Sequence, residues 1–425
     1  MLARVHREEH SRLLATLVRR FGDLELAEDA AQEAMEAALR TWPERGVPQQ
    51  PLAWLITTAR RAALDRVRRN ATYARRLAEL HLRQRETPPL PQAPEAPADA
   101  TLLTEEQLPD DRLAMLMGCC HPALAPADRI ALMLRFVGAL STAEVAAALL
   151  VPVPTMAARL TRAKKRLRTH RIRLSVPEDP QERARRLPLV LTAISLVFTE
   201  GYAASSGDAP IRQELTGEAI RLARIVHRLV PAAAEPQGLL ALLLLTEARS
   251  PARQDEEGVP IALEDQDRTR WDQDSITEGL ALAEEAAGRE DAARFTVQAA
   301  IAAVHAEADR FEDTDWAQIV ALYSLLLRNG EDPVVRMNRA IAVGRRDSPA
   351  AGLELLEELA GEPGLAGHHP YQVALALFLS ETGRTADADR AWNRALELAG
   401  NSSERRFIER RRVRPPGVSG GILER

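Results

Sequence analysis

The chain has 425 residues, 46% of them hydrophobic and 4% aromatic; this length suggests two to four domains and this composition a nearly all-helical protein. Its net charge of −5 is uneven, because residues 1–173 hold 27 Lys or Arg against 20 Asp or Glu and the remainder holds 29 against 41. A basic first part favours contact with nucleic acid. No apolar run is long enough to span a bilayer and the first twenty residues do not resemble a signal peptide, so we expect a cytoplasmic protein with no membrane partner.

The first domain is expected over residues 1–78 and contains an acidic amphipathic helix from Leu24 to Trp42. One side is apolar: Leu26, Ala30, Ala34, Ala37 and Ala38. The other side is polar and mostly acidic: Glu25, Glu28, Asp29, Gln32, Glu33 and Glu36. An acid near a helix start complements the helix dipole, which accounts for Glu25 but not for the acids further along.

A loop from Pro43 to Pro51 precedes a basic helix whose core stripe is Leu52, Leu55, Ile56, Ala59, Ala63 and Val67. Arginines flank this stripe at positions 60, 61, 66, 68 and 69. Trp54 lies next to the stripe near the loop. Two roles remain open for it: packing in the core, or forming a platform on which an unstacked base sits.

Five prolines between residues 86 and 103 predict a tether, which we place at residues 79–108. In the second domain, residues 109–173, Cys119 and Cys120 are adjacent beside His121. Neighbouring ligands point apart on a regular element, and the chain has no second ligand pair. We therefore expect buried cysteines and neither a metal nor a cofactor.

The second domain ends in a predicted helix-turn-helix. Ser141 and Glu144 have the spacing of a capping box, and Pro154 suits the start of the second helix. That helix has a buried stripe of Met156, Leu160, Ala163 and Leu167, and an adjacent face of Thr155, Arg159, Arg162 and Arg166. A charge run usually marks only a solvated face. The offset of the two stripes instead favours a recognition helix that enters the major groove.

Residues 183–412 form an acidic, helical tail. Amphipathic segments cover residues 274–287, 291–309, 315–328, 333–345, 349–360, 370–382 and 385–399. Two helix pairs begin 37 residues apart, at Pro333 and Pro370, which is near the period of tetratricopeptide hairpins and predicts a solenoid with a binding groove. We interpret residues 201–208 as a helix-to-helix turn, and residues 263–272 as a turn fixed by salt bridges with Arg268 and Arg270.

Three blocks in this order resemble a bacterial sigma factor of the sigma-70 family, extracytoplasmic-function (ECF) type. DLELAEDAAQEAMEAALRTW is similar to the polymerase-binding helix of region 2, PLAWLITTARRAALDRVRR to its promoter-melting helix, and STAEVAAALLVPVPTMAARLTRAKKRLR to the region 4 helix-turn-helix. CCHPAL and FTEGYAASSGD, with the long tail, resemble the ECF branch that bears a tetratricopeptide-like C-terminal extension. The resemblance implies an all-α fold: two small helical sigma domains followed by a solenoid.

The resemblance also implies three sets of binding residues. Those that meet the β′ clamp helices of core RNA polymerase are Glu25, Glu28, Asp29, Gln32 and Glu33. Those at the minus-10 element are Arg45, Gln49, Gln50, Trp54, Arg60, Arg61 and Arg68. Those at the minus-35 element are Thr155, Ala158, Arg159, Thr161, Arg162, Lys165 and Arg166. Ala157 and Ala158 replace a Lys-Ser pair found in many members, which leaves Arg159 and Arg162 as the best base readers.

The expected function is that of an alternative sigma factor, which binds core polymerase through its β′ clamp helices and β flap, melts specific promoters and starts transcription. The tail would take a protein or peptide partner, and would regulate the factor or only stabilise it. We expect no enzyme activity, because the tail's histidines are scattered. The alternative is a helix-turn-helix regulator that acts without being a polymerase subunit.

Overall fold

The structure is a computed structural model that describes all residues except 1, 83–110, 150, 205–210, 329 and 414–425. Over this described part every regular element is a helix, and the β-structure is limited to one isolated bridge between Gln254 and Pro260. The all-α prediction is confirmed. Most of the predicted tether and residues 205–208 of the predicted turn lie outside the described residues.

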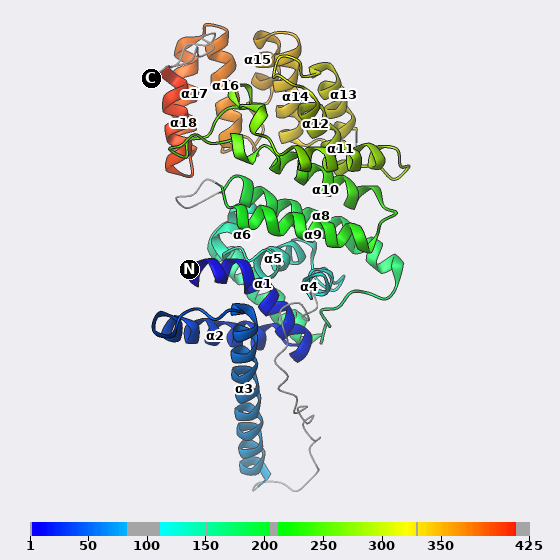
Figure 1. Ribbon diagram of the computed structural model, residues 1–425, viewed down its shortest axis with the longest axis vertical. Coiled ribbons are helices and arrows are strands. Elements are labelled where there is room, and N and C mark those ends of the chain that lie inside the picture. The colour runs from blue at the N-terminus through cyan, green and yellow to red at the C-terminus, as the bar shows by residue number, and fades with distance from the viewer. Residues whose placement is uncertain (1, 83–110, 150, 205–210, 329, 414–425) are drawn as a thin grey trace. The chain divides into compact units, whose positions relative to one another are not determined.

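Two compact units divide the chain, Met1–Ala193 and Ile194–Arg425. The helices of the first unit are α1 (Leu2–Phe21), α2 (Leu24–Arg45), α3 (Pro51–Leu82), α4 (Arg112–Cys119), α5 (Pro126–Phe136), α6 (Thr142–Ala148) and α7 (Val153–Thr169) (Figure 1). The division falls inside α8 (Pro180–Tyr202).

Helices α1, α2 and α3 share a core of small and aliphatic side chains. Its fully buried members include Leu13, Leu14, Ala27, Ala31, Ala34, Leu52, Leu55 and Ala59. Asp23 caps α2, where its Oδ1 accepts the backbone N–H groups of Glu25 at 2.9 Å and Leu26 at 3.1 Å. Alanines along α2 allow the three helices to pack closely, so the apolar side predicted for this helix is its packing side, although Leu26 and Ala37 are only half-buried.

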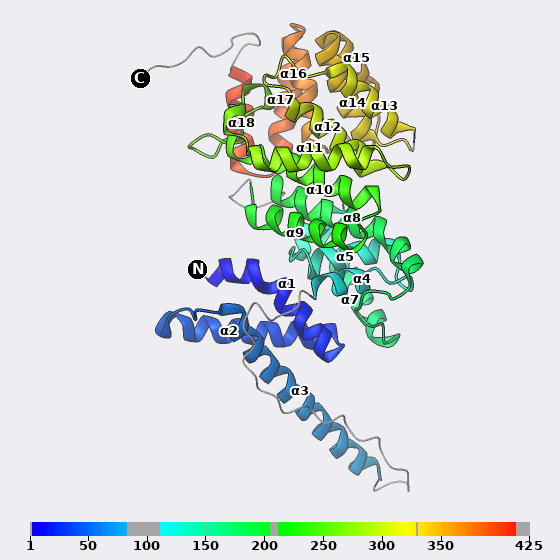
Figure 2. The same cartoon turned by 45° about the vertical axis from the view of Figure 1, so that its right-hand side comes forward.

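Two expectations for this first part of the chain are wrong. Helix α2 includes Pro43 and continues to Arg45, so the loop begins at Gly46, whose φ of 81° ends the helix. Val67 is 43% exposed instead of buried. Figure 2 shows that α3 extends beyond α1 and α2, and the exposure of Val67 shows that these helices do not cover its side of α3.

The predicted helix-turn-helix is confirmed as α6 and α7. The Ser141 hydroxyl accepts the Glu144 N–H at 3.2 Å, and the Ser141 N–H donates to the Glu144 carboxylate at 2.6 Å, which completes the capping box. All four residues of the predicted stripe on α7 are buried. Helix α7 begins at Val153, one residue before Pro154.

Both cysteines are buried at the end of α4. Burial raises the pKa of Cys119 to about 12, so its thiol stays protonated at neutral pH. A Cβ on the neighbouring Gly118 would lie 2.3 Å from the backbone of Leu174. These residues therefore serve close packing between α4 and the segment after α7.

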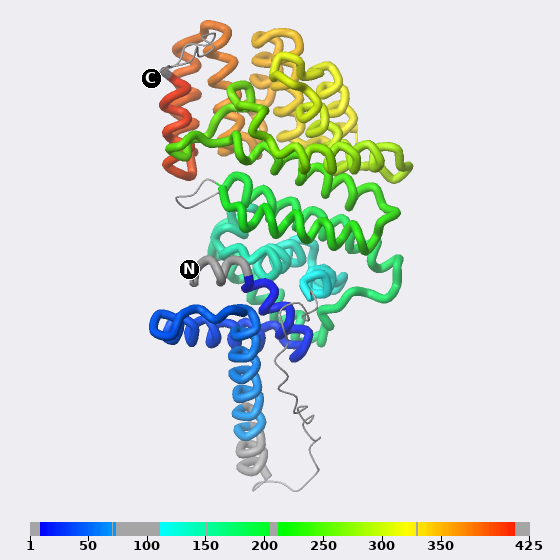
Figure 3. The backbone as a smooth tube through the Cα atoms, in the orientation of Figure 1, coloured from blue at the N-terminus to red at the C-terminus, as the bar shows by residue number. Residues whose placement is uncertain are grey.

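After α8, the second unit consists of helices that run antiparallel to their neighbours, and Figure 3 shows the chain reversing direction between them. Its helices are α9 (Gln213–Leu229), α10 (Ala234–Glu247), α11 (Gln273–Ala287), α12 (Arg294–Glu307), α13 (Trp316–Leu327), α14 (Pro333–Arg346), α15 (Pro349–Glu358), α16 (His369–Glu381), α17 (Thr385–Leu398) and α18 (Ser402–Val413). The seven predicted segments correspond to α11–α17. They were predictable because each has an amphipathic pattern and is separated from the next by polar residues, Gly or Pro.

The connection between α10 and α11 contains the short 3-10 turns η3 (Leu263–Asp265) and η4 (Arg268–Arg270). The salt bridges expected of Arg268 within this turn are absent from the described contacts. Arg268 instead donates to the carbonyls of His305 at 2.7 Å and Ala308 at 2.5 Å. The acids of η3 pair with arginines far away in the sequence, which local spacing does not indicate.

Close contact between α14 and α15 depends on two glycines. A Cβ on Gly352 would lie 2.6 Å from the Cα of Gly344 and 2.9 Å from the buried ring of Phe378. Because a backbone atom would have to move, we expect Gly352→Leu to destabilise the second unit by about 1–3 kcal/mol. Gly361→Leu is the control, since nothing lies within 4 Å of the Cβ position there. Urea unfolding followed by circular dichroism should show a lower midpoint for Gly352→Leu only.

Candidate functional site

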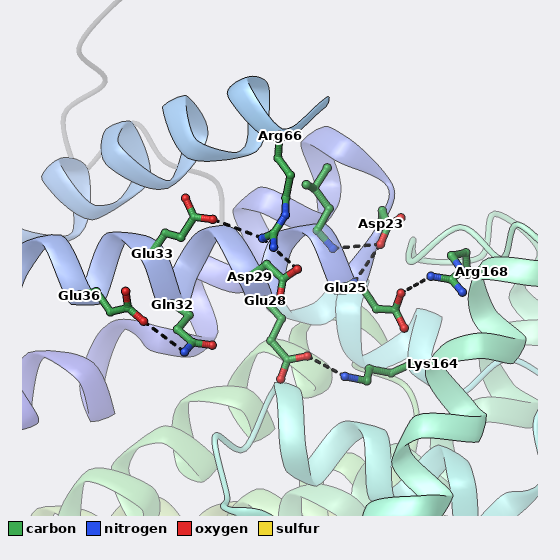
Figure 4. Close-up of polar contacts among 11 residues, drawn as sticks. Asp23, Glu25, Glu28, Asp29, Gln32, Glu33, Glu36, Arg66, Lys164 and Arg168 are labelled. Carbon is green, nitrogen blue, oxygen red and sulfur yellow. Dashed lines mark hydrogen bonds and ion pairs between the residues drawn. The ribbon is translucent and has the colours of Figure 1, made fainter. Parts of the chain in front are cut away.

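Two carboxylates at the start of α2 face α7 (Figure 4). The Glu28 carboxylate lies 2.9 Å from Nζ of Lys164 and 3.7 Å from Nη2 of Arg135 on α5. Glu25 pairs with Arg168. The side chains of Glu28 and Lys164 are only 26% and 21% exposed. This first part of the acidic face is therefore covered by basic residues of the helix-turn-helix.

The next acids on α2 face α3 instead. Nη1 of Arg66 lies 2.9 Å from Asp29 and 3.3 Å from Glu33, and these acids remain 50% and 42% exposed. Gln32 donates to Glu36 at 3.3 Å on the exposed side (Figure 4). The structure thus places the five predicted polymerase residues on one helix but divides them: Glu25 and Glu28 are engaged by α7, and the other three keep access to solvent.

The predicted minus-10 residues lie around the junction of α2 and α3. Arg45, Gln49 and Gln50 are exposed. Trp54 is half-buried on the first turn of α3, with its ring 5.4 Å from that of buried Trp42 at an interplanar angle of 64°. Edge-to-face packing fixes the Trp54 ring while leaving part of it accessible, so the two roles considered for it are compatible.

Arginines extend this surface along α3. Arg61 and Arg68 are exposed, and Nη1 of Arg68 lies 3.5 Å from Asp65. Partial burial and the nearby charge of Arg60 lower the pKa of Arg20 on α1. Two guanidinium groups close together create a local positive potential, which suits a phosphate backbone.

Helix α7 presents its predicted contact face to solvent with one exception. The exposed members are Thr155, Ala158, Thr161, Arg162, Lys165 and Arg166. Arg159 is half-buried, with its Nε 3.9 Å from Asp128 of α5. The Thr161 hydroxyl donates to the Ala157 carbonyl of its own helix at 2.9 Å. Arg162 is therefore the more accessible of the two arginines expected to read bases.

Sequence patterns do not indicate the contacts of Lys164 and Arg168 with α2. They lie on a third side of α7, which is neither the buried stripe nor the face of Thr155, Arg159, Arg162 and Arg166. Their sequence positions offer one signal: Lys164 and Arg168 are four residues apart, so their side chains lie on the same side of α7 and can contact the same neighbour. Their acidic partners are more than 130 residues away, and no local rule indicates such a pair.

No single helix in the described ranges is long and apolar enough to cross a membrane; α6 and α7 pass that test only as a pair bent by 105°. Among those same residues, no cluster of three or more His, Cys, Asp or Glu side chains has an arrangement suited to a metal ion.

Three family models match separate parts of the chain. Residues 5–73 match Sigma-70 region 2, residues 114–167 match Sigma-70 region 4, and residues 186–287 match a family of unknown function, DUF6596. An uncharacterized protein of Rhizobium meliloti (strain 1021) is 42% identical over 400 residues, which cover 93% of this chain and 91% of that protein. The matched sigma regions support a DNA-binding role in transcription initiation. The chain belongs to the sigma-70 family and carries a helical C-terminal extension that includes a domain of unknown function.

Proposed function

We propose that the chain is an alternative sigma factor of the ECF type, which binds core RNA polymerase, recognises and melts specific promoters and directs transcription initiation. One observation carries this proposal: the first unit combines an acidic helix face with two separate basic surfaces. The acidic face is on α2, and the basic surfaces are on α3 and α7. A sigma factor needs all three, because it must bind the enzyme and two promoter elements.

Each of the three surfaces would bind a different partner. Asp29, Gln32 and Glu33 would meet the β′ clamp helices, and the helix-turn-helix would meet the β flap and the minus-35 element. Trp54 and the loop after Gly46 would receive a flipped base of the minus-10 element. Flipping a base costs a few kcal/mol, which stacking on a held indole ring and contacts to nearby arginines offset.

A regulator that acts without being a polymerase subunit would use α7 in the same way. It has no use for an acidic α2 face with accessible carboxylates, and this favours the sigma factor. Size-exclusion chromatography of the full chain with purified core polymerase distinguishes the two. A sigma factor co-elutes with the core enzyme without DNA, whereas a separate regulator does not.

We also propose that polymerase binding requires the contact between α2 and α7 to open. Glu25 and Glu28 belong to the proposed polymerase face, yet Arg168 and Lys164 pair with them. A further ion pair, between Nε of Arg19 on α1 and Asp111 before α4 at 3.0 Å, joins the same two domains. The free chain would therefore hold part of its polymerase face closed with its own recognition helix.

Removing the two cations on α7 should strengthen binding to core polymerase. Partly exposed ion pairs contribute about 0.2–1 kcal/mol each, so we expect the double variant Lys164→Ala/Arg168→Ala to bind core polymerase roughly two- to thirtyfold more tightly. The matched control is Lys165→Ala/Arg166→Ala, which removes the same charge from exposed positions on the same helix. Fluorescence titration without DNA measures both. Equal affinity of the two double variants would contradict the closed contact.

The helical extension would act on the sigma domains from within the same chain, where a covalent connection gives a high effective concentration. Antiparallel helix pairs at a spacing near that of tetratricopeptide repeats support a tetratricopeptide-like domain that binds a protein, a peptide or a small molecule.

A further inference from the structure

A cavity of about 250 Å³ lies within the second unit. Its walls come from α12, α13, α14, α16 and α18, and the connection between α10 and α11 closes one side. Figure 1 shows this connection reaching α18. No residue proposed to bind polymerase or DNA lines the cavity, so the function proposed above leaves it unexplained.

One wall of the cavity is aromatic. The Trp316 ring lies 5.3 Å from the rings of both His305 and Phe311, edge to face in each case, and Tyr323 is nearby on the same helix. These four residues are only half-buried, although they sit inside a helical domain. Burial, with the charges of Arg249 and Arg268, lowers the pKa of His305 to about 4, so its ring is neutral at pH 7.

A carboxylate of the chain itself, that of Glu264, lies at another edge of the cavity. Glu264 of η3 lies 3.4 Å from Nη2 of Arg345 on α14 and also pairs with Arg411 on α18. Arg345 has a second partner in Glu381 at 3.0 Å, and Arg411 has one in Asp265 at 2.9 Å. Glu264, Arg345 and Arg411 belong to three different elements. The guanidinium groups of Arg345 and Arg411 therefore both bind the Glu264 carboxylate at the edge of the cavity.

Two further arginines, Arg249 and Arg268, act on His305 but do not line the cavity. Nε of Arg249 and Nη2 of Arg268 are buried and have no hydrogen-bond partner in the described part of the chain. Both act electrostatically on His305, and Arg249 also acts on Tyr323. The acids that act on Arg268 are exposed: Asp309, Glu312 and Asp313. These two guanidinium groups therefore add positive charge near His305, and each keeps one buried nitrogen without a partner in the described part of the chain.

We propose that this cavity binds a small carboxylic acid that carries an aromatic ring. The ring would lie against Trp316 and Phe311, and the carboxylate would bind Arg345 and Arg411 in exchange for Glu264. The volume fits such a ligand, because a cavity of about 150 Å³ already accepts benzene. A longer peptide could enter only if the connection between α10 and α11, which closes one side of the cavity, moved away from it. Release of Glu264 would loosen that connection from α18, which gives the ligand a way to alter the extension.

The test uses the full chain and isothermal titration calorimetry with 2-naphthoate, compared with its neutral analogue 2-naphthamide. We expect naphthoate to saturate a single site and naphthamide to bind at least tenfold more weakly. Arg345→Gln should reduce this preference for the acid to less than threefold. Arg339→Gln is the control on the same helix, because Arg339 hydrogen-bonds Ser324 at 2.9 Å and does not line the cavity.

Filling the cavity provides an independent variant. Ala342 and Asn338 both line it, so Ala342→Leu and Asn338→Leu should each abolish naphthoate binding while the chain keeps its helical circular dichroism. If one variant fails to fold, the other decides. Absence of saturation at millimolar naphthoate, equal binding of the amide, or undiminished binding by a folded filling variant would overturn the proposal. Since no polymerase is present, the result is independent of the proposed sigma activity.

Discussion

Reversing the charges of Asp29 and Glu33 together should lower the affinity for core RNA polymerase by about 100-fold, or about 2.7 kcal/mol. Both carboxylates remain about half exposed although they pair with Arg66 of α3, and α7 does not pair with them. Among the acids predicted to bind polymerase, they are therefore the two that a basic partner helix can reach without displacing α7. Losing one member of an interfacial charge pair costs about 2–5 kcal/mol, and a reversed charge adds repulsion. Fluorescence titration of Asp29→Lys/Glu33→Lys against core polymerase measures the change.

The control for this variant is Glu44→Lys, which reverses one charge, half the change of the double variant, at an exposed position near the end of α2. Arg66 loses its two partners in the double variant, so thermal unfolding of the first unit has to be compared as well. A folded double variant that binds core polymerase as tightly as Glu44→Lys would show that the acidic face is not the polymerase-binding surface.

Arg162→Ala should weaken binding to the cognate minus-35 element by about 1–3 kcal/mol, which is roughly 5- to 150-fold, and should relax specificity at one base pair. Arg162 is exposed on the contact face of α7, whereas Arg159 is half-buried beside Asp128. An arginine that contacts a guanine edge loses two hydrogen bonds on truncation. Binding to a set of promoters with single base changes measures both the affinity and the specificity.

Arg173→Ala is the matched control, because it removes one exposed arginine beyond the end of α7. It should weaken all promoter sequences to a similar, smaller extent and leave their order unchanged, as expected for loss of a charge without base contact. If Arg162→Ala behaved in the same way as this control, Arg162 would contact only phosphate, and base reading would have to come from another residue.

Local patterns predicted most of the fold correctly. The capping box at Ser141, the stripe from Met156 to Leu167 and the segments that became α11–α17 all follow from rules that act within a few residues. Val67 shows where such a rule fails. It has the right helical position for the stripe on α3, but burial also requires a neighbouring helix on the same side, and Val67 is 43% exposed.

Long-range pairings are the part of the candidate site that the sequence did not reveal. Glu28 and Lys164 are 136 residues apart, and many other acids and bases in the chain were equally plausible partners. Arg159 was expected on the contact face, yet its side chain is half-buried and lies 3.9 Å from Asp128 of another helix. The cavity in the second unit requires six segments to come together, so its aromatic wall and its arginines had no common signal in the sequence.

Run-off transcription with purified core RNA polymerase and the full chain tests the central proposal most directly. Templates would carry genomic promoter fragments, and the reaction without the chain is the baseline. We expect defined transcripts that depend on the chain and that decrease strongly with Asp29→Lys/Glu33→Lys. Binding of the chain to promoter DNA with no transcript from core polymerase on any template would contradict the account, and would identify a regulator that is not a polymerase subunit.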